Sequence, residues 1–318
     1  MTDAWQRVRA VVRYDGLFWR RFAYLGSAYG PWWWRRYSPA AIGAIFYGAL
    51  PDKRRAVREN IDRIAQQATP LVHEAMTLST FVNFARCLTD CLEAAGPEPP
   101  EFEVDAVGDD ILADVVARGR GGVMVTAHLG NWELIGRLVR RKGFPITVAM
   151  ARERNATVRG FVDWQRGQDG VEIVYTDGDV FGALDLLRVL RHNRILALQL
   201  DRPAGGEGDR VLPFFGVPTR FPLGPFLLAQ AASAPVLPVF TFLDGHHRYR
   251  VEQQTMGLIP RRGGVAAAEE ALARAVRLLE DAVRRHPDQW FHFTAIGGEG
   301  WAVAPARPVS AAAGTAHG

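Results

Sequence analysis

The stretch Gly122-Val123-Met124-Val125-Thr126-Ala127-His128-Leu129-Gly130-Asn131-Trp132-Glu133 decides the fold. Its first six residues form a short apolar run that begins with glycine, which is typical of a strand buried on both faces. Residues 131–141 then follow a helical pattern that Gly143 and Pro145 end. Gly130 permits a tight bend between the two elements. The stretch therefore predicts a strand, a glycine turn and a helix, the repeating unit of an α/β sheet.

The same alternation continues on both sides of this stretch. Further helices are expected at 109–118, 155–168, 179–191, 223–232 and 266–285, and further strands at 146–151, 171–175, 195–200 and 235–243. The glycine- and proline-rich residues 203–222 are expected to form a long loop, and Asp244-Gly245 a hairpin turn into a strand at 249–253. Helices between short apolar strands predict an α/β fold with a mostly parallel central sheet flanked by helices.

Residues 1–100 have a different pattern and are expected to form a helical region of their own. Helices are predicted at 54–67 and 70–95, and Pro31–Tyr37 places three consecutive tryptophans beside two arginines. Aromatic rings beside arginine are favoured at a membrane–water interface, so this region is predicted to bind membranes. The alternative is an ordinary aromatic core under a pair of helices. The α/β core is expected to span residues 101–301, and the tail at 302–318 is expected to be disordered.

Charge and composition narrow the class of partner. The net charge is +4, and Lys53 and Lys142 are the only lysines, so arginine carries almost all the positive charge. Arginine suits phosphate groups, although a GC-rich genome also explains the bias. No dense basic run indicates nucleic acid, and no apolar run approaches the ~20 residues of a spanning helix. We therefore expect a protein that does not span the membrane and has no cleavable signal peptide.

Polar residues gather where the predicted parallel strands end. His128 follows the first strand, Arg152 the second, and Asp201-Arg202 the strand at 195–200. Ligands of open parallel sheets bind beyond the carboxyl ends of the strands, so these side chains are expected to share one edge. A histidine, an acid and arginines together predict an acid/base site that also binds anions.

His128 is the candidate general base of this site. Glu133 lies in the first turn of the following helix, where the helix dipole favours a carboxylate, and it could hold one imidazole nitrogen. Asp201 is the other candidate partner of the histidine, unless it caps a helix or pairs with Arg202. The free amides at the start of this helix could bind phosphate or stabilise an oxyanion.

The spacing of a histidine and an acid five residues later is weak evidence by itself. With 8 histidines and 34 acidic residues in 318, about one such pair is expected by chance. His247 and Glu252 make a second pair, but they lie in a strand pattern, where positions five apart face opposite sides. His247 is therefore expected to be a surface residue of the hairpin. Cys87 and Cys91 lack a second pair for zinc and are expected to be buried thiols in a reducing compartment, with no metal site.

Residues 126–133, Thr-Ala-His-Leu-Gly-Asn-Trp-Glu, resemble the signature of the bacterial lipid A biosynthesis acyltransferases, which include the lauroyl and myristoyl transferases. The phosphatidylinositol mannoside acyltransferases are similar. Further segments that match the family are Arg54-Arg55, Asn60-Ile61, Pro213–Gly216, Thr219 and Pro287–Phe291. The resemblance implies an O-acyltransferase that moves a fatty acyl group from an acyl-carrier-protein or coenzyme A thioester to a hydroxyl of a lipid or glycolipid, without a cofactor or metal. Its implied partners are membrane surface lipids and the acyl donor, and its implied location is the cytoplasmic face of the inner membrane, as a peripheral protein.

Position by position, the resemblance makes His128 the base and Glu133 its acidic partner. Arg166 matches an arginine that holds an anionic headgroup in the family, and Asp201-Arg202 match an acidic block after the fourth strand. The complete set of substrate-binding candidates is Gly130, Asn131, Arg152, Arg166, Asp201 and Arg202. The chain departs from the family at Ala151-Arg152 and at His292-Phe293-Thr294, where other members have more charged residues.

Two other functions fit part of the same pattern. A glycerol-phosphate or lysophospholipid acyltransferase shares the histidine–acid spacing and differs in its acceptor. A non-catalytic lipid-binding protein could keep the fold, although the presence of both His128 and Glu133 argues against a dead enzyme. A serine hydrolase is disfavoured because the chain has no Gly-x-Ser-x-Gly segment. A dinucleotide-binding enzyme is disfavoured because the glycine-rich residues 119–122 precede a strand instead of following one.

Overall fold

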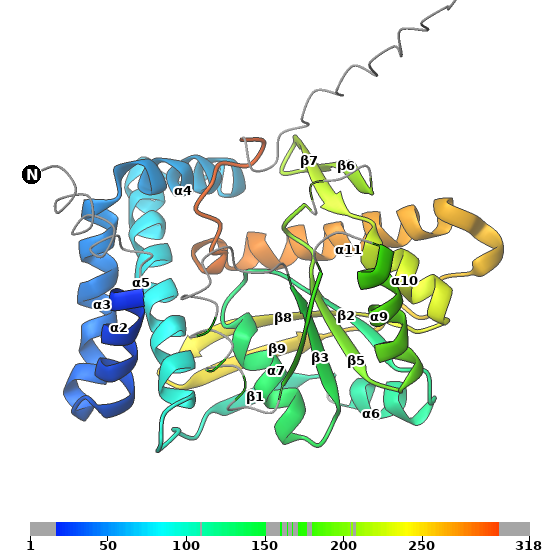
Figure 1. The fold of residues 1–318 in the computed structure, drawn as a ribbon. Helices are drawn as coiled ribbons and strands as arrows, with labels where there is room; N and C mark the ends of the chain where they lie inside the picture. Colours follow the sequence, from blue (N-terminus) through cyan, green and yellow to red (C-terminus); the bar gives the residue numbers. More distant parts are fainter. Residues whose placement is uncertain are drawn as a thin grey trace, which may run out of the picture.

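The chain folds into a mostly parallel sheet flanked by helices, as the sequence predicts (Figure 1). A computed structural model describes residues 17–108, 110–150, 171–176, 180–203 and 208–298, together with Gly160, Trp164, Gly167 and Gly205. The predicted tail at 302–318 and most of the predicted helix at 155–168 lie outside the described residues.

The central sheet has seven strands in the order β1-β9-β8-β2-β5-β3-β4 among the described residues. Five of its six neighbouring pairs are parallel, and only β8 and β9 run antiparallel. The strands are β1 (Glu103–Val107), β2 (Gly122–Thr126), β3 (Ile146–Met150), β4 (Glu172–Tyr175), β5 (Ile195–Gln199), β8 (Val236–Gly245) and β9 (Arg248–Gln253). The central strand β2 is buried along its whole length, which its apolar run predicts.

Helices cover both faces of the sheet, because successive side chains of a strand point to opposite sides. Val123 and Val125 of β2 share a core with α9 (Val180–Arg191), α10 (Gly224–Ala232) and α11 (Gly264–Arg285). Met124 shares the core of the other face with α6 (Asp110–Ala117) and α7 (Trp132–Arg141). The sheet therefore forms the middle of three layers, with the carboxyl end of β2 leading into α7.

The helices described between residues 17 and 94 stand at one end of this sandwich (Figure 1). They are α2 (Leu17–Tyr29), α3 (Trp32–Ala49), α4 (Pro51–Ile64) and α5 (Pro70–Ala94). Helix α5 lies between the α2–α3 pair and the sheet, and its last turns share a buried cluster with Leu134 of α7, Tyr249 of β9 and Phe291. The N-terminal helices are thereby packed against the part of the molecule that carries β2 and α7.

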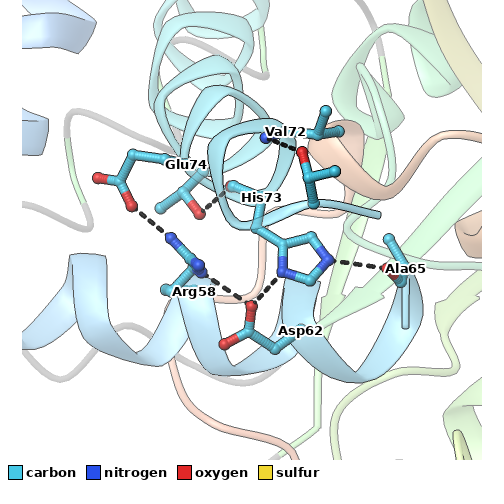
Figure 2. Close-up of polar contacts among 8 residues, drawn as sticks. Arg58, Asp62, Ala65, Val72, His73 and Glu74 are labelled. Carbon is cyan, nitrogen blue, oxygen red and sulfur yellow. Dashed lines mark hydrogen bonds and ion pairs between the residues drawn. The ribbon is translucent and has the colours of Figure 1, made fainter. Parts of the chain in front are cut away.

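Polar contacts join α4 to the start of α5, as Figure 2 shows. His73 on α5 bonds Asp62 on α4 through Nδ1 at 2.6 Å and the Ala65 carbonyl through Nε2 at 2.8 Å. Arg58 on α4 bridges Asp62 at 2.8 Å and Glu74 at 2.5 Å. His73 is buried and bonds both helices, so it stabilises their packing.

Two predicted connections and one strand differ between the sequence pattern and the structure. Residues 203–222 are not one loop, because they contain the hairpin of β6 (Asp209–Phe214) and β7 (Val217–Pro222). The turn between β8 and β9 lies at His246-His247 and not at Asp244-Gly245, because β8 continues through an irregularity between Leu243 and Gly245. Strand β1, which the sequence pattern did not predict, pairs with β9 at an edge of the described sheet, and its residues alternate between exposed and partly buried.

Helix boundaries otherwise agree with the predicted ones within a few residues. The largest shift is at α4, which begins at Pro51 instead of residue 54, because proline is favoured at the first turn of a helix. Across the described residues, no helix combines the length and apolar character that crossing a membrane requires.

Candidate functional site

The carboxyl ends of β2 and β5 bring His128 and Asp201 together. The two strands are parallel neighbours, with Val125 opposite Leu198 and Thr126 opposite Gln199. Continuing that register by two residues places His128 opposite Asp201, and their side chains meet with Nδ1 and Oδ1 2.9 Å apart. His128 is 5% exposed and Asp201 is fully buried. The predicted meeting of these two residues at one sheet edge is therefore confirmed.

The carboxylate of Asp201 accepts three hydrogen bonds from two residues. The His128 ring reaches Oδ1, and the His128 backbone amide donates to Oδ2 at 2.9 Å. The indole Nε1 of Trp290 also donates to Oδ2, at 2.9 Å. Since an ionised carboxylate only accepts, the imidazole must carry its proton on Nδ1, and the neutral ring then keeps the lone pair on Nε2.

These contacts keep the carboxylate ionised although it is buried. Burial alone would raise the pKa of Asp201, but the charge and hydrogen bonds of His128 lower the pKa below its ordinary value. Burial lowers the pKa of the neighbouring His292 to about 4. His292 is therefore neutral near pH 7, and it lies against Trp290 with ring centroids 5.0 Å apart.

Gly130 makes the turn after His128 possible. Its φ of +54° is a left-handed conformation that side chains disfavour, and a Cβ atom there would lie 2.0 Å from the Thr241 carbonyl oxygen of β8. Its amide donates to the Gln289 carbonyl at 2.8 Å. Gly130 is thus explained by the close approach of three backbone segments, and its predicted contact with substrate stays a prediction.

The side chain of Asn131 points toward α5. Its Nδ2 donates to the Cys87 carbonyl at 3.1 Å and to the Tyr249 hydroxyl at 3.0 Å, and its Oδ1 accepts from the Cys91 thiol at 2.8 Å. Tyr249 in turn donates to Asp90 of α5. Burial raises the pKa of both thiols, which confirms the prediction of buried cysteines. Asn131 anchors the turn after His128 to α5, and its role in substrate binding stays a prediction.

Other predicted site residues have different outcomes. The sequence left either Asp201 or Glu133 as the partner of one imidazole nitrogen, and Asp201 lies at Nδ1. Glu133 lies in the first turn of α7, and its catalytic role stays a prediction. Arg202 is exposed beside Asp201, and its charge contributes to the lowered pKa of His292. Arg152 and Arg166 lie outside the described residues.

His247 is not the surface residue that the sequence predicts. Its Nε2 lies 2.9 Å from Oε2 of Glu93 and 3.5 Å from Oδ1 of Asp90, and the exposed fraction of its side chain is 21%. Asp90, His246 and His247 are the one group in the described part of the chain whose potential metal ligands lie within 4.8 Å of one another. The His247 nitrogen is already bonded to Glu93, so the arrangement is explained as an ion pair without a metal.

Trp290 is the residue of this site that the sequence reasoning missed. It lies 89 positions after Asp201, with no spacing that links the two. It reaches the site because residues 289–291 pair with the turn at 128–130, with a bridge between Leu129 and Trp290. The match of 287–291 to a family segment was its sole signal in the sequence.

A histidine and a buried carboxylate at the end of a parallel strand, followed by a glycine turn and a helix, agree with the family that residues 126–133 resemble. The model of the bacterial lipid A biosynthesis acyltransferases matches residues 11–295. The chain belongs to this family. The part of the chain that matches the family model, residues 11–295, contains every predicted site residue and the segment with Trp290.

Among curated proteins, the chain is similar to phosphatidylinositol mannoside acyltransferases. It is 34% identical over 185 residues to that of Mycobacterium tuberculosis, a region that covers 58% of this chain and 56% of the relative. It is 27% identical over 203 residues to that of Mycolicibacterium smegmatis, which covers 63% of this chain and 66% of the relative. The similarity therefore spans little more than half the length of the Mycobacterium tuberculosis protein.

Proposed function

We propose that the protein transfers a fatty acyl group from a thioester to a hydroxyl of a glycolipid, with His128 as the general base. The observation that carries this proposal is the 2.9 Å contact between His128 Nδ1 and the buried Asp201. That contact fixes one tautomer and leaves Nε2 as the nitrogen that can accept a proton. The family and the relatives support acyl transfer as the reaction class.

In the proposed reaction, Nε2 of His128 takes the proton of the acceptor hydroxyl as its oxygen attacks the thioester carbonyl carbon. The carbonyl electrons move onto oxygen, and they return as the carbon–sulfur bond breaks. The imidazolium then gives its proton to the leaving thiolate, so the products are an ester and a thiol, and the histidine is neutral again. Asp201 stabilises the imidazolium by its charge and does not take the proton.

Further residues are proposed for binding and charge stabilisation. Arg202 is exposed next to Asp201, where its guanidinium could hold a phosphate of the donor or the acceptor. Arg152 and Arg166 are proposed for the same kind of contact from the sequence alone. Glu133 is proposed as a second catalytic carboxylate at the start of α7. No cofactor or metal is part of this proposal.

The acceptor and the donor are proposed at different levels of detail. The relatives carry the name phosphatidylinositol mannoside acyltransferase, so a mannosylated phosphatidylinositol is the first acceptor to test. The donor is proposed as an acyl-coenzyme A or an acyl-carrier protein.

The exposed aromatic residues of α2 and α3 support attachment to a membrane surface. We define the aromatic face as Phe18, Trp19, Phe22, Leu25, Tyr29, Trp32, Trp33 and Tyr37, all of which are exposed. Trp34 instead packs against Gly26 and Gly30 of α2, so the three tryptophans do not share one environment. Arg21 and Arg36 are exposed on the same two helices, which suits anionic headgroups. We propose that this face holds the protein peripherally at the inner membrane.

The catalytic proposal is tested with His128→Ala in an assay of acyl transfer to a mannosylated phosphatidylinositol. The variant is expected to lose roughly 10²–10⁴-fold in rate, the contribution of general base catalysis. His192→Ala is the matched control, because His192 is an exposed histidine at the end of α9. Transfer at the normal rate by a folded His128→Ala protein would exclude the mechanism. Comparison of acyl-coenzyme A with acyl-carrier protein, and of this acceptor with lysophosphatidic acid, identifies both substrates and tests the glycerolipid alternative.

Membrane attachment is tested separately by flotation with vesicles that contain anionic phospholipid. Replacing both Trp32 and Trp33 by serine is expected to reduce the bound fraction, because both rings are exposed on the aromatic face. Leu258→Ser removes an exposed apolar side chain outside that face and serves as the control. Equal binding of the double variant and the wild type would refute the membrane role of these tryptophans.

A further inference from the structure

The second oxygen of the Asp201 carboxylate is held by a residue from the far end of the chain. Oδ2 accepts from the His128 amide and from the indole of Trp290, both at 2.9 Å, while Oδ1 faces the imidazole. We propose that Trp290 is a positioning residue, whose indole N–H fixes the orientation of the Asp201 carboxylate toward His128. This inference rests on the proposed function, in which that pair performs the proton transfer.

Because Asp201 is buried, water cannot replace the hydrogen bond that the Trp290 indole donates to it. Asp201 is fully buried, so a lone pair that loses its donor cannot turn to water. Rotation about the bond to the carboxylate is soft for an aspartate, and only its hydrogen bonds decide which oxygen meets the ring. Two donors on Oδ2 therefore leave Oδ1 in place for Nδ1. Without the indole donor, the carboxylate would be freer to rotate away from the ring. Its negative charge would also be shared with one donor fewer and would act more strongly on the imidazole.

Trp290 itself is buried and firmly held. Its exposed fraction is 2%, and its ring lies edge-on to Phe214 with centroids 5.6 Å apart. On either side of it, the Phe291 amide donates to the His128 carbonyl at 2.7 Å, and Gly130 donates to the Gln289 carbonyl. The tryptophan is thus attached to the same turn that carries the histidine.

Side chains from other elements fix the segment that carries Trp290. The Gln289 amide group bonds the backbone of Leu243 in β8, through its oxygen at 2.7 Å and its nitrogen at 2.9 Å. Asn60 of α4 bonds the backbone of 292, 294 and 296, at distances between 2.9 and 3.1 Å. With its backbone held from two sides, the indole nitrogen has one orientation, which is the condition for positioning a neighbour.

The test is Trp290→Phe, which keeps an aromatic ring and removes the donor. The value of kcat is expected to fall roughly 10- to 100-fold with little change in KM, because a buried hydrogen bond to a charged group is lost. The acidic limb of the pH profile of kcat/KM is expected to move to higher pH, since the carboxylate then stabilises the imidazolium more strongly. Among the described residues, His292 helps to lower the pKa of Asp201, and Arg202 helps to lower that of His292; both side chains stay unchanged in the variant.

Phe214→Leu is the matched control, because it loosens the packing around Trp290 and leaves the indole donor in place. The control is expected to unfold more easily and to keep the acidic limb of the wild type. Equal shifts of that limb in both variants, or none in Trp290→Phe, would overturn the positioning role.

A second measurement covers a Trp290→Phe protein that does not fold. Benzothienylalanine at position 290 replaces the indole N–H by sulfur and keeps the shape of the ring. In the proton NMR spectrum, the signal of the His128 Nδ1 proton is expected to shift in this variant and to vanish in His128→Ala. An unshifted signal would overturn the inference. Transfer by His128→Ala would instead refute the proposed function, so the two failures are distinguishable.

Discussion

Two histidines of this chain lie five residues before a glutamate, and each bonds an acid from a distant part of the chain. His128 bonds Asp201, 73 positions away, and His247 bonds Glu93 at 2.9 Å, 154 positions away. The partner of His128 comes from the neighbouring parallel strand, whereas that of His247 comes from an N-terminal helix. Spacing along the chain therefore indicated neither Asp201 nor Glu93. The position of His128 at the carboxyl end of a parallel strand did indicate Asp201.

The two histidines also use different ring nitrogens. Asp201 holds Nδ1 of His128, and Glu93 holds Nε2 of His247. His128 lies at the carboxyl end of β2, where ligands of open sheets bind, while His247 lies in the β8–β9 turn with a φ of +55°. One arrangement suits proton transfer to a ligand, and the other joins a hairpin to α5.

We call His128 with Asp201 the first cluster, and His247 with Glu93 and Asp90 the second. The largest expected difference between them is the effect of a substitution on kcat. Asp201→Asn keeps the size of the side chain but removes the charge that stabilises the imidazolium, and its amide can present a donor to Nδ1. We expect kcat to fall by roughly 10²–10⁴-fold, by analogy with the loss of the oriented acid in a serine protease triad. Glu93→Gln is the corresponding change at His247 and is expected to affect stability far more than kcat. Similar losses of kcat in both variants would contradict the distinction between the clusters.

The meeting of His128 and Asp201 could be predicted in part from the sequence. Apolar runs identify the strands, and the residues that follow parallel strands lie at the same edge of the sheet. The apolar runs at 122–127 and 195–200 indicated buried strands of one parallel sheet, so the residues after them were expected at the same sheet edge. The contact between His128 and Asp201 follows once the register is parallel. Which of Asp201 and Glu133 bonds the ring depends on side-chain direction, which the pattern does not contain.

Contacts between distant segments could not be predicted. Trp290 and Tyr249 reach the turn at 128–131 through tertiary packing, and no periodicity of the chain relates them to it. The hairpin within 203–222 was missed because its glycines and prolines indicate a loop, although Asp209–Phe214 alternates in burial. The strand pairing in that segment comes from its partner across the hairpin and not from its composition.

Tyr249 joins the two clusters, and its removal is the next largest expected effect. Its hydroxyl donates to Asp90, beside His247, and accepts from Asn131, beside His128. Burial raises the pKa of this phenol, so it stays protonated as a donor. Tyr249→Phe is expected to lower the free energy of unfolding by about 1–3 kcal/mol, the cost of an unsatisfied buried group. Urea denaturation measures this, with the exposed Tyr37→Phe as control; equal stability of both variants would exclude the proposed link.

The cluster around His247 is expected to make stability depend on pH. Burial lowers the pKa of His247, but the hydrogen bond that its ring donates to Glu93 and the charges of Asp90 and Glu93 outweigh this and raise the pKa. A raised pKa means that this stabilisation is complete below the ordinary value near 6.5 and is lost as the pH rises through the folded value. Burial also raises the pKa of Asp90 to about 6, so Asp90 destabilises the fold over a lower window as the pH rises.

His247→Gln should therefore flatten the loss of stability between pH 6 and pH 9, by about 1 kcal/mol for a partly exposed ion pair. Urea denaturation across this range is the measurement, and His192→Gln is the control on an exposed histidine. The other charged groups that influence the site are His246, Arg35, Arg36 and Arg86. An unchanged slope in His247→Gln would show that these groups, and not His247, determine the pH dependence.

The smallest expected change in the free energy of unfolding is at Glu252, the acid that lies five residues after His247. Glu252 instead bonds Arg285 of α11 through both oxygens, at 2.9 and 2.7 Å. The hydrogen bonds from Arg285 lower the pKa of Glu252, so the pair stabilises the fold above the ordinary value and loses this effect as the pH falls. Since Arg285 is half-exposed, Glu252→Gln is expected to cost about 0.2–1 kcal/mol at pH 7, with no change in kcat and less loss at pH 4. A pH dependence of stability like that of His247→Gln would mean that the spacing had identified a real pair after all.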